Sequence, residues 1–336
     1  MANEASRIEN PDSTPGAVST GYQRQNTLLT SLFNGIDCSV IEGGVGEITI
    51  KISGPIDVNG VLYSIASEAV LALSGGAANY VVYLDGTGVT LTPTLTTTPG
   101  SFDSTKNAHY TAGGKRILNW MIQWDGVNAR VYKLGQDQWE DTLTANGTWT
   151  AMFSKVYEIW VTGKGGNGGD ATVTGSNDTA GAGGGAGLTG KKKIYIKAGD
   201  EWTSVFSAIS GGNTSISDGA TTLTAQNGYD GQDAIDTFSS KGGKGGFTSS
   251  GFDFSFGGNP GESNTGQDAK GSRIVSNGAG SYYGGGGLGA DSGNSDGGDA
   301  KGYGSGGGGA LRLPPPPAFG TNIGGTGASG IIRIIG

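Results

Sequence analysis

The segment GAGLTGKK, from Gly185 to Lys192, is the closest match in this sequence to a phosphate-binding loop. Its spacing fits the P-loop through Lys191, where backbone N–H groups and a lysine hold phosphates. The next position must be Ser or Thr to reach Mg²⁺, yet Lys192 stands there, and strand-like residues follow where the motif needs a helix. We therefore reject a nucleotide site. Looser glycine patterns of the dinucleotide-binding type are expected by chance in a chain with 68 glycines.

Other groups that could do chemistry are few and scattered. The segment DSGNSDGGDA supplies oxygen donors from Asp291, Asn294, Asp296 and Asp299. Ca²⁺ takes six to eight oxygen ligands, but the EF-hand spacing is absent, so a solvated acidic turn is favoured. His109 is the only histidine and has no evident nucleophile beside it, so we expect it on or near a domain surface. We predict no catalytic residues, no metal site, no cofactor and no enzyme activity.

Aromatic side chains between glycine clusters are the stronger functional signal. Rings stack on sugars and anchor protein interfaces, although some could simply pack against the flanks of a glycine-rich core. Binding is favoured for the tyrosine pair because small and polar residues surround it. The candidate receptor-binding residues are Trp202, Phe252, Phe254, Phe256, Tyr282, Tyr283 and Tyr303. The lysines at 191–193 would suit an acidic glycan, but a solvated strand edge is the favoured interpretation.

These rings must be positioned by a most unusual glycine-rich region. After residue 160 the chain holds 50 of its 68 glycines, many of them clustered. Each glycine inside a helix or strand costs about 0.5–1 kcal/mol relative to alanine, so an ordinary α/β domain is excluded. A disordered linker is also disfavoured, because strand-like islands such as IYIKAGDEW and the terminal SGIIRIIG interrupt the glycines. We expect an ordered domain.

Glycine runs can order as polyproline-II-type chains that lie side by side. Such chains rise about 3.1 Å per residue and form no internal hydrogen bonds, so each N–H and C=O can pair with a neighbouring chain. Any Cβ in the middle of that packing would clash. The fold class we predict is mainly β: a small sandwich or barrel-like domain, followed by a glycine-rich domain of polyglycine-II helices framed by short strands.

Three regions follow along the chain. Residues 1–35 form a lead segment with Leu28, Leu29, Leu32 and Phe33 at helical spacing, either a packed cap or a docking segment onto a larger partner. Residues 36–135 form a β-rich module with regularly spaced strands and hairpin turns such as Asp125-Gly126. Residues 136–336 form the glycine-rich domain, with strand entry at 139–162 and a closing strand at 330–336. The entry aromatics are expected to be core anchors: Trp139, Trp149, Phe153, Tyr157 and Trp160.

Composition limits the partners. The net charge of −8 and the pI near 4.7 argue against nucleic acid, because phosphate binding needs a basic footprint. The polar start has no apolar signal region, and no window approaches 18 apolar residues, so we expect no export signal and no membrane insertion. The single cysteine, Cys38, excludes an intrachain disulfide and a thiolate metal cluster.

Two segments resemble bacteriophage fibre proteins. WEDTLTANGTWTAMFSKVYEIWVTGKGGNGGD resembles the opening of the glycine-rich domain of tail fibres and receptor-binding tip proteins, and GGTGASGIIRIIG resembles its closing strand. The chain departs from that pattern at Ala151-Met152, where Val-Pro is usual, at Thr162, and at Pro314–Pro317. The segment NYVVYLDGTG…RILNWMIQWDG is similar to a recurrent fibre module.

The resemblance implies a non-enzymatic virion protein of a tail fibre or tail tip, assembled in the host cytoplasm. It implies loops that contact a host surface glycan or outer-membrane protein, other tail or virion proteins as partners, and a homotrimer. The alternative is a purely structural virion component, such as a capsid-decoration, collar or connector protein, without receptor contact. A glycan depolymerase would need a carboxylate pair across a groove, which the sequence does not show.

Overall fold

The computed structural model describes residues 46–336, apart from 59–60, 74–75, 86–91, 104–107, 128, 134–138, 176–177, 237–238, 266–275, 291–293 and 314–319. The described residues form strands, turns and extended runs, and none of them is helical, which confirms a mainly β chain. The expected docking residues Leu28, Leu29, Leu32 and Phe33 lie outside the described residues. The chain divides into two compact units: unit 1 is Met1–Gln138 with Met152–Ser154, and unit 2 is Trp139–Ala151 with Lys155–Gly336.

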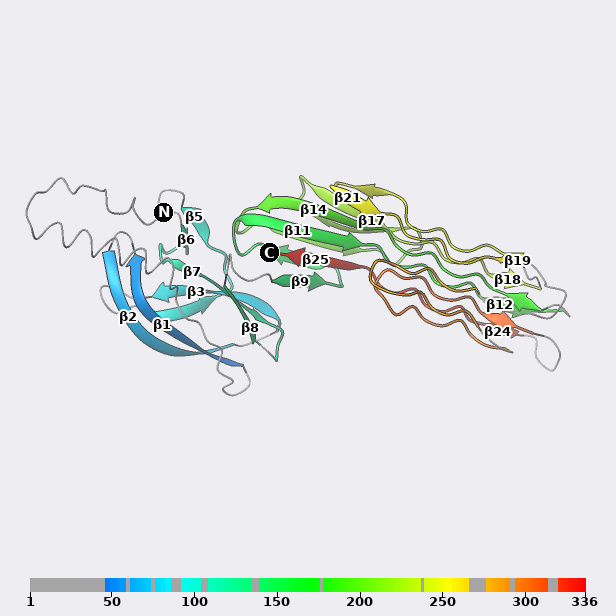
Figure 1. Ribbon diagram of the computed structural model, residues 1–336, viewed down its shortest axis with the longest axis horizontal. Coiled ribbons are helices and arrows are strands. Elements are labelled where there is room, and N and C mark those ends of the chain that lie inside the picture. Colours follow the sequence, from blue (N-terminus) through cyan, green and yellow to red (C-terminus); the bar gives the residue numbers. More distant parts are fainter. Residues whose placement is uncertain are drawn as a thin grey trace, which may run out of the picture. The chain divides into compact units, whose positions relative to one another are not determined.

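Unit 1 is built from antiparallel strands (Figure 1). Its strands are β1 (Glu47–Val58), β2 (Val61–Ala72), β3 (Ala78–Asp85), β4 (Thr92–Thr96), β5 (Ser101–Asp103), β6 (Ala108–Tyr110), β7 (Ile117–Trp124) and β8 (Ala129–Lys133). They form the hairpin β1-β2, the sheet β4-β3-β7-β8 and the pair β5-β6. Among the described strands no closed barrel forms.

Apolar side chains from several strands make the core of unit 1. The buried cluster consists of Ile48, Leu73, Val82, Leu84, Leu118, Ile122 and Trp124. The β7–β8 hairpin turns at Asp125-Gly126, as expected, where Gly126 has φ +98° and the Asp125 carboxylate accepts the Val127 N–H at 2.8 Å. A left-handed φ suits glycine because it has no Cβ to clash with the backbone.

Unit 2 begins and ends in two five-stranded antiparallel sheets. Their strands are β9 (Glu140–Leu143), β10 (Gly147–Thr150), β11 (Lys155–Thr162), β14 (Thr189–Ile196), β15 (Glu201–Phe206), β16 (Asn213–Ser217), β17 (Thr222–Gln226), β20 (Ser249–Ser250), β21 (Phe254–Phe256) and β25 (Ile331–Ile335). The first sheet, called sheet D, has the order β21-β14-β11-β25-β9, and the second, sheet E, has the order β10-β15-β16-β17-β20. The closing strand β25 therefore lies between the entry strands β11 and β9.

Side chains between sheets D and E form the large-residue core of unit 2. Trp139 and Trp149 each meet the ring of Tyr157 edge-on, with centroids 5.9 and 5.3 Å apart. All three rings are buried, as expected for core anchors. Phe153 is buried too, but it belongs to unit 1, where it packs edge-on against His109 at 5.6 Å.

Glycine runs extend from these sheets to a far end of unit 2 (Figure 1). The far end carries short strands: β12 (Ala171–Val173), β13 (Thr179–Ala180), β18 (Ala234–Ile235), β19 (Ser239–Ser240), β22 (Asn264–Thr265), β23 (Leu311–Arg312) and β24 (Gly320–Asn322). They pair as β18-β12-β24, β13-β23 and β19-β22. The runs are thus framed by sheets at one end and by short strand pairs at the other.

The hydrogen bonds between runs repeat every three residues. In the run 163–170, the N–H groups of Gly163, Gly166 and Gly169 donate to carbonyls of the run 181–188, at 2.7–2.9 Å. The N–H groups of Lys164, Asn167 and Asp170 donate to side chains on the run 227–233. The N–H groups of Gly165 and Gly168 donate to carbonyls of the run 325–328. Successive residues therefore point toward three different neighbours. That the single runs are polyglycine-II helices stays a prediction, for which this repeat is the argument.

The run 181–188, GAGGGAGL, lies at the centre. It exchanges backbone hydrogen bonds with the runs 163–169, 226–232, 243–246, 259–262, 277–279 and 304–310. All eight residues are buried, and a Cβ built on Gly184 would lie 2.2 Å from the Gly166 carbonyl oxygen. No direction leads to solvent, so every position from Gly181 to Gly187 is Gly or Ala; only Leu188, directly before β14, is larger.

Outer runs place a polar residue at every third position instead. Asn227, Asp230 and Asp233 each accept a backbone N–H from the neighbouring run, at 2.7–2.9 Å. Asp296 and Asp299 do the same for the N–H groups of 323 and 326, at 2.7 Å. The solvated acidic turn expected there is therefore wrong in part: these carboxylates satisfy backbone donors that face away from the lattice.

Candidate functional site

The outer face of sheet D gathers the residues that are best suited to contact a partner. Along β11, Tyr157, Ile159 and Val161 are fully buried against sheet E. Successive side chains of a strand point to opposite faces, so Glu158 and Trp160 lie on the outer face. Trp160 stands directly opposite Lys191 on β14 and Arg333 on β25, which places all three side chains in one row across the sheet.

Five rings meet on this face and form what we call the aromatic surface cluster. Its members are Trp160, Phe254, Phe256, Tyr282 and Tyr283. The Tyr282 ring stacks between Trp160 and Phe256, with centroids 5.4 and 5.6 Å apart and interplanar angles of 26° and 27°. Phe254 and Tyr283 add edge-on contacts at 4.5 and 5.1 Å. Mutual packing fixes the rings, yet Phe254, Phe256 and Tyr282 remain 55%, 41% and 56% exposed.

Ion pairs border the cluster. The Lys191 ammonium lies 4.8 Å from the centre of the Trp160 ring and 2.9 Å from a Glu158 carboxylate oxygen. The indole N–H of Trp160 donates to the same oxygen at 2.7 Å. At the other side, the Arg333 guanidinium lies 5.6 Å from the centre of the Tyr283 ring and pairs with Glu140. Each cation therefore lies against both a ring and a carboxylate.

These contacts set the charges of the site. The Arg333 hydrogen bond holds the pKa of the Glu140 carboxyl below its usual value, and Glu140 in turn raises the pKa of Arg333. Burial raises the pKa of Glu158, but hydrogen bonds from Lys191 and Trp160 outweigh it, so that pKa is also lowered. Burial raises the pKa of the Tyr283 phenol. The rings are therefore bordered by ion pairs whose charges compensate one another.

A tight turn on the lattice holds the tyrosine pair. Ser281 and Gly284 form an antiparallel bridge, with the Ser281 N–H donating to the Gly284 carbonyl at 2.9 Å. The Ser281 hydroxyl accepts the Tyr283 N–H at 3.1 Å and donates to the Tyr303 carbonyl at 2.5 Å. The hydroxyl of Ser305, which is fully buried, donates to that of Ser281 at 3.0 Å. The turn is therefore fixed to the packed runs.

The structure separates the candidate residues chosen from the sequence. Phe254, Phe256, Tyr282 and Tyr283 come together in the cluster, and Tyr283 is the more buried tyrosine of the pair. Tyr303 is 42% exposed, and its backbone carbonyl accepts the hydrogen bond from Ser281 that helps to hold the same turn.

Two candidates do not join the cluster. Trp202 is 1% exposed and stands opposite Trp149 in sheet E, so its assignment to receptor contact is wrong and its ring belongs to the core. Phe252 lies on the other face of sheet D. Its ring fills the space above Gly190, which pairs with the buried Val161.

Trp160 is the member of the aromatic surface cluster that was not among the candidates chosen from the sequence. It was expected in the core with the other entry aromatics, and for Trp160 that prediction is wrong. The signal was present, because Tyr157 and Trp160 are three residues apart in one strand and so lie on opposite faces. His109 lies near the surface of unit 1, as expected: it is half-buried, and its Nε2 accepts the Ser154 N–H at 3.3 Å.

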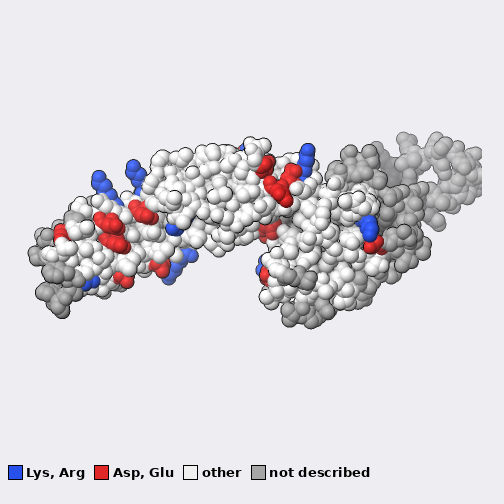
Figure 2. Space-filling model, turned by 180° about the vertical axis from the view of Figure 1, so that it is seen from behind, with Lys and Arg blue, Asp and Glu red and all other residues white. Residues whose placement is uncertain are grey.

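No catalytic or metal-binding arrangement accompanies the cluster. Within the described residues there is no group of three or more His, Cys, Asp or Glu side chains placed to bind a metal ion. The described part of the chain also has no helix long and apolar enough to span a membrane. On the face drawn in Figure 2, acidic and basic side chains of the described residues lie in small groups separated by uncharged surface.

Gly185 to Lys192, the segment that came closest to a phosphate-binding loop, runs from the central run directly into β14. The lysines lie within this strand, where a phosphate-binding loop would need a helix, as expected. Comparison with known proteins adds no assignment: no protein-family model matches the chain, and no curated protein matches it.

Proposed function

We propose that this protein is a non-enzymatic virion protein of a bacteriophage tail fibre or tail tip, and that unit 2 binds a receptor on the bacterial surface through the aromatic surface cluster. The observation that carries the proposal is the stack of Phe256, Tyr282 and Trp160, which stays exposed although it is fixed by packing. The resemblance of the entry and closing segments to phage fibre domains supports the virion assignment.

Rigid exposed rings favour binding on physical grounds. Aromatic side chains contribute much of the binding energy of protein interfaces, and they lose little conformational entropy on binding because they have few rotatable bonds. The cluster rests on a five-stranded sheet and on a turn tied to Ser305, so little conformational entropy remains to be lost. Lys191, Glu158, Arg333 and Glu140 would form a polar rim around it.

Replacing Tyr282 and Phe256 together by alanine tests this proposal. We expect binding of the labelled protein to susceptible cells, measured across a panel of bacterial strains, to fall about tenfold or more. Burying one large apolar side chain contributes about 1.5–3 kcal/mol, and about 1.4 kcal/mol is tenfold in affinity.

Tyr195→Ala is the matched control, because Tyr195 is 57% exposed on β14 of the same sheet but makes no ring contact with the cluster. Thermal melting should show both variants folded. If the wild-type protein binds no strain, or if the double variant binds like the control, the receptor proposal is wrong. Immunogold labelling of particles would then test the alternative, a structural virion component without receptor contact.

A further inference from the structure

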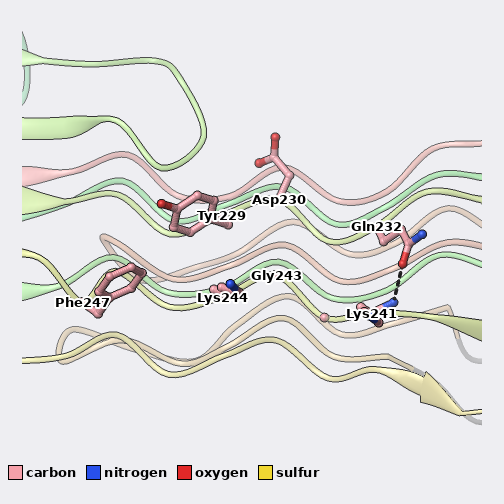
Figure 3. A pocket seen from close by; sticks show the side chains of 8 residues that line it. Tyr229, Asp230, Gln232, Lys241, Gly243, Lys244 and Phe247 are labelled. Atoms are coloured by element: carbon pink, nitrogen blue, oxygen red, sulfur yellow. Dashed lines mark hydrogen bonds between the residues drawn. The ribbon is translucent and has the colours of Figure 1, made fainter.

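A groove of about 320 Å³ lies between two neighbouring glycine runs of unit 2, and none of its lining residues belongs to the aromatic surface cluster. One wall is the run 229–232 and the other is the run 241–247 (Figure 3). The Tyr229 N–H donates to the Lys244 carbonyl at 2.8 Å and the Gln232 N–H to the Lys241 carbonyl at 3.0 Å. These bonds fix the two walls against each other, and Gly243, between the two lysines in sequence, is buried.

The three-residue repeat decides which side chains face this groove. Lys241, Lys244 and Phe247 follow one another at intervals of three along one run, and Tyr229 and Gln232 are three apart on the other. Because the runs repeat every three residues, each set points in one direction. The outcome is a line of functional groups along the groove, with rings at one end and amines at the middle and the other end (Figure 3).

The rings form a platform. Tyr229 and Phe247 are nearly parallel, with an interplanar angle of 14° and centroids 6.4 Å apart. Gln226 holds both, because its amide donates to the Tyr229 hydroxyl at 3.1 Å and accepts the Phe247 N–H at 3.1 Å. Phe247 is 66% exposed. An exposed ring that is held in place is suited to the C–H face of a sugar ring.

The amines supply positive charge in a chain whose net charge is −8. In the described part of the chain, neither the Lys241 nor the Lys244 ammonium group forms an ion pair. Asp230 supplies the carboxylate among the lining residues; it accepts the Asn167 N–H at 2.7 Å and points away from both lysines (Figure 3). The Gln232 side chain uses its oxygen for the Lys241 N–H, at 3.1 Å, and keeps its amide hydrogens for a ligand.

We propose that this groove binds a linear acidic oligosaccharide. One sugar ring would stack on Tyr229 and Phe247, and the carboxylates of uronate residues further along the chain would pair with Lys244 and Lys241. Lys241 and Lys244 are three residues apart, and three residues of extended chain span at most about 10 Å. The two ammonium groups can therefore pair with charges that follow one another along a linear polymer. This site is independent of the receptor contact proposed for the aromatic surface cluster.

Isothermal titration of the purified full chain tests the proposal. The probes are tetrasaccharides of alternating glucuronate and N-acetylglucosamine, oligogalacturonate of equal length, and neutral chitotetraose. We expect saturable binding of at least one acidic probe, at least about tenfold tighter than the neutral probe and weakened by salt. The double variant Lys241→Ala/Lys244→Ala should lose about tenfold in affinity, and Phe247→Ala a similar factor.

Lys197→Ala/Lys301→Ala is the matched control, since it removes the same charge from exposed lysines outside the groove, and it should bind within about twofold of wild type. Tyr282→Ala/Phe256→Ala should also keep its affinity for the oligosaccharide, which separates this site from the aromatic surface cluster. The proposal is overturned if no acidic probe binds better than chitotetraose, or if the Lys241/Lys244 variant binds as the control does.

Discussion

At the sheet end of unit 2, large side chains such as Trp202 and Tyr157 fill the interior, whereas along the glycine runs the interior of the central run 181–188 contains almost nothing larger than a methyl group. The sheet end is stabilised by apolar area removed from water. The runs are stabilised by hydrogen bonds between backbones, against the high conformational entropy that glycine loses on folding. The sheet end should therefore be destabilised by removing a large side chain, whereas the glycine runs should be destabilised by adding even a methyl group.

Trp202→Ala should give the largest loss, because it removes the largest part of the side-chain core. We expect the free energy of unfolding to fall by about 3–5 kcal/mol, measured by denaturant titration. Trp202→Phe is the informative control. Among the described residues the buried Trp202 indole N–H has no hydrogen-bond partner, so the change to phenylalanine loses packing but no hydrogen bond and should cost far less. Equal losses for the two variants would show that the ring volume is not what matters.

Adjacent glycines in one run test the backbone core. A Cβ on Gly286 would lie 2.0 Å from the Gly278 carbonyl oxygen, whereas a Cβ on Gly285 would meet nothing within 4 Å. We expect Gly286→Ala to destabilise unit 2 by about 3 kcal/mol, since backbone must move to admit the methyl group. Gly285→Ala should be neutral or slightly stabilising, because alanine loses less entropy on folding. A similar loss at both positions would contradict close backbone packing.

The polar edge of the runs should matter less. Asp233 accepts the Asp170 N–H at 2.9 Å from an exposed position. Asp233→Ala should cost about 1 kcal/mol, because that N–H must find water instead. Asp233→Asn keeps an acceptor oxygen and should change the stability little. If asparagine and alanine behave alike in chemical denaturation, the hydrogen bond contributes nothing.

The smallest effect is a loss of stability at low pH, and we expect it in unit 1 because His109 lies there. Burial lowers the pKa of His109 below its usual 6.5, so the unfolded chain binds the proton more readily than the folded one. Stability of unit 1 is therefore full above pH 6.5 and decreases as the pH falls below it. Protonation would also remove the acceptor that Nε2 offers to Ser154. His109→Gln should flatten this dependence in thermal melts, and an unchanged profile would refute the assignment.

Much of this architecture follows from local patterns. Side chains alternate between the core and the outer face along β11 and β15. This alternation places Tyr157 and Trp202 in the core and Trp160 and Val205 on the outer faces. The many aromatic residues in these segments made the alternation hard to recognise in the sequence. The triplet pattern KGGNGGD of an outer run also differs visibly from GAGGGAG at the centre.

Which runs become neighbours could not be predicted. Gly165 donates to Ala328, far along the chain, and the choice depends on how all the runs pack together. For the same reason the sequence could nominate Phe256 and Tyr282 separately but could not show that they stack. Nor could it show that Lys241, Lys244 and Tyr229 face one groove.

The three-residue repeat restricts how this chain can change length. Inserting one residue into a run such as 163–170 would rotate everything after it by a third of a turn, so that Asn167 and Asp170 would face packed backbone and glycines would face water. Only insertions or deletions of three residues, or multiples of three, keep the pattern in phase. The turns that join the runs have no three-residue requirement, so their length and sequence can vary wherever they are not tied to the framework beneath them.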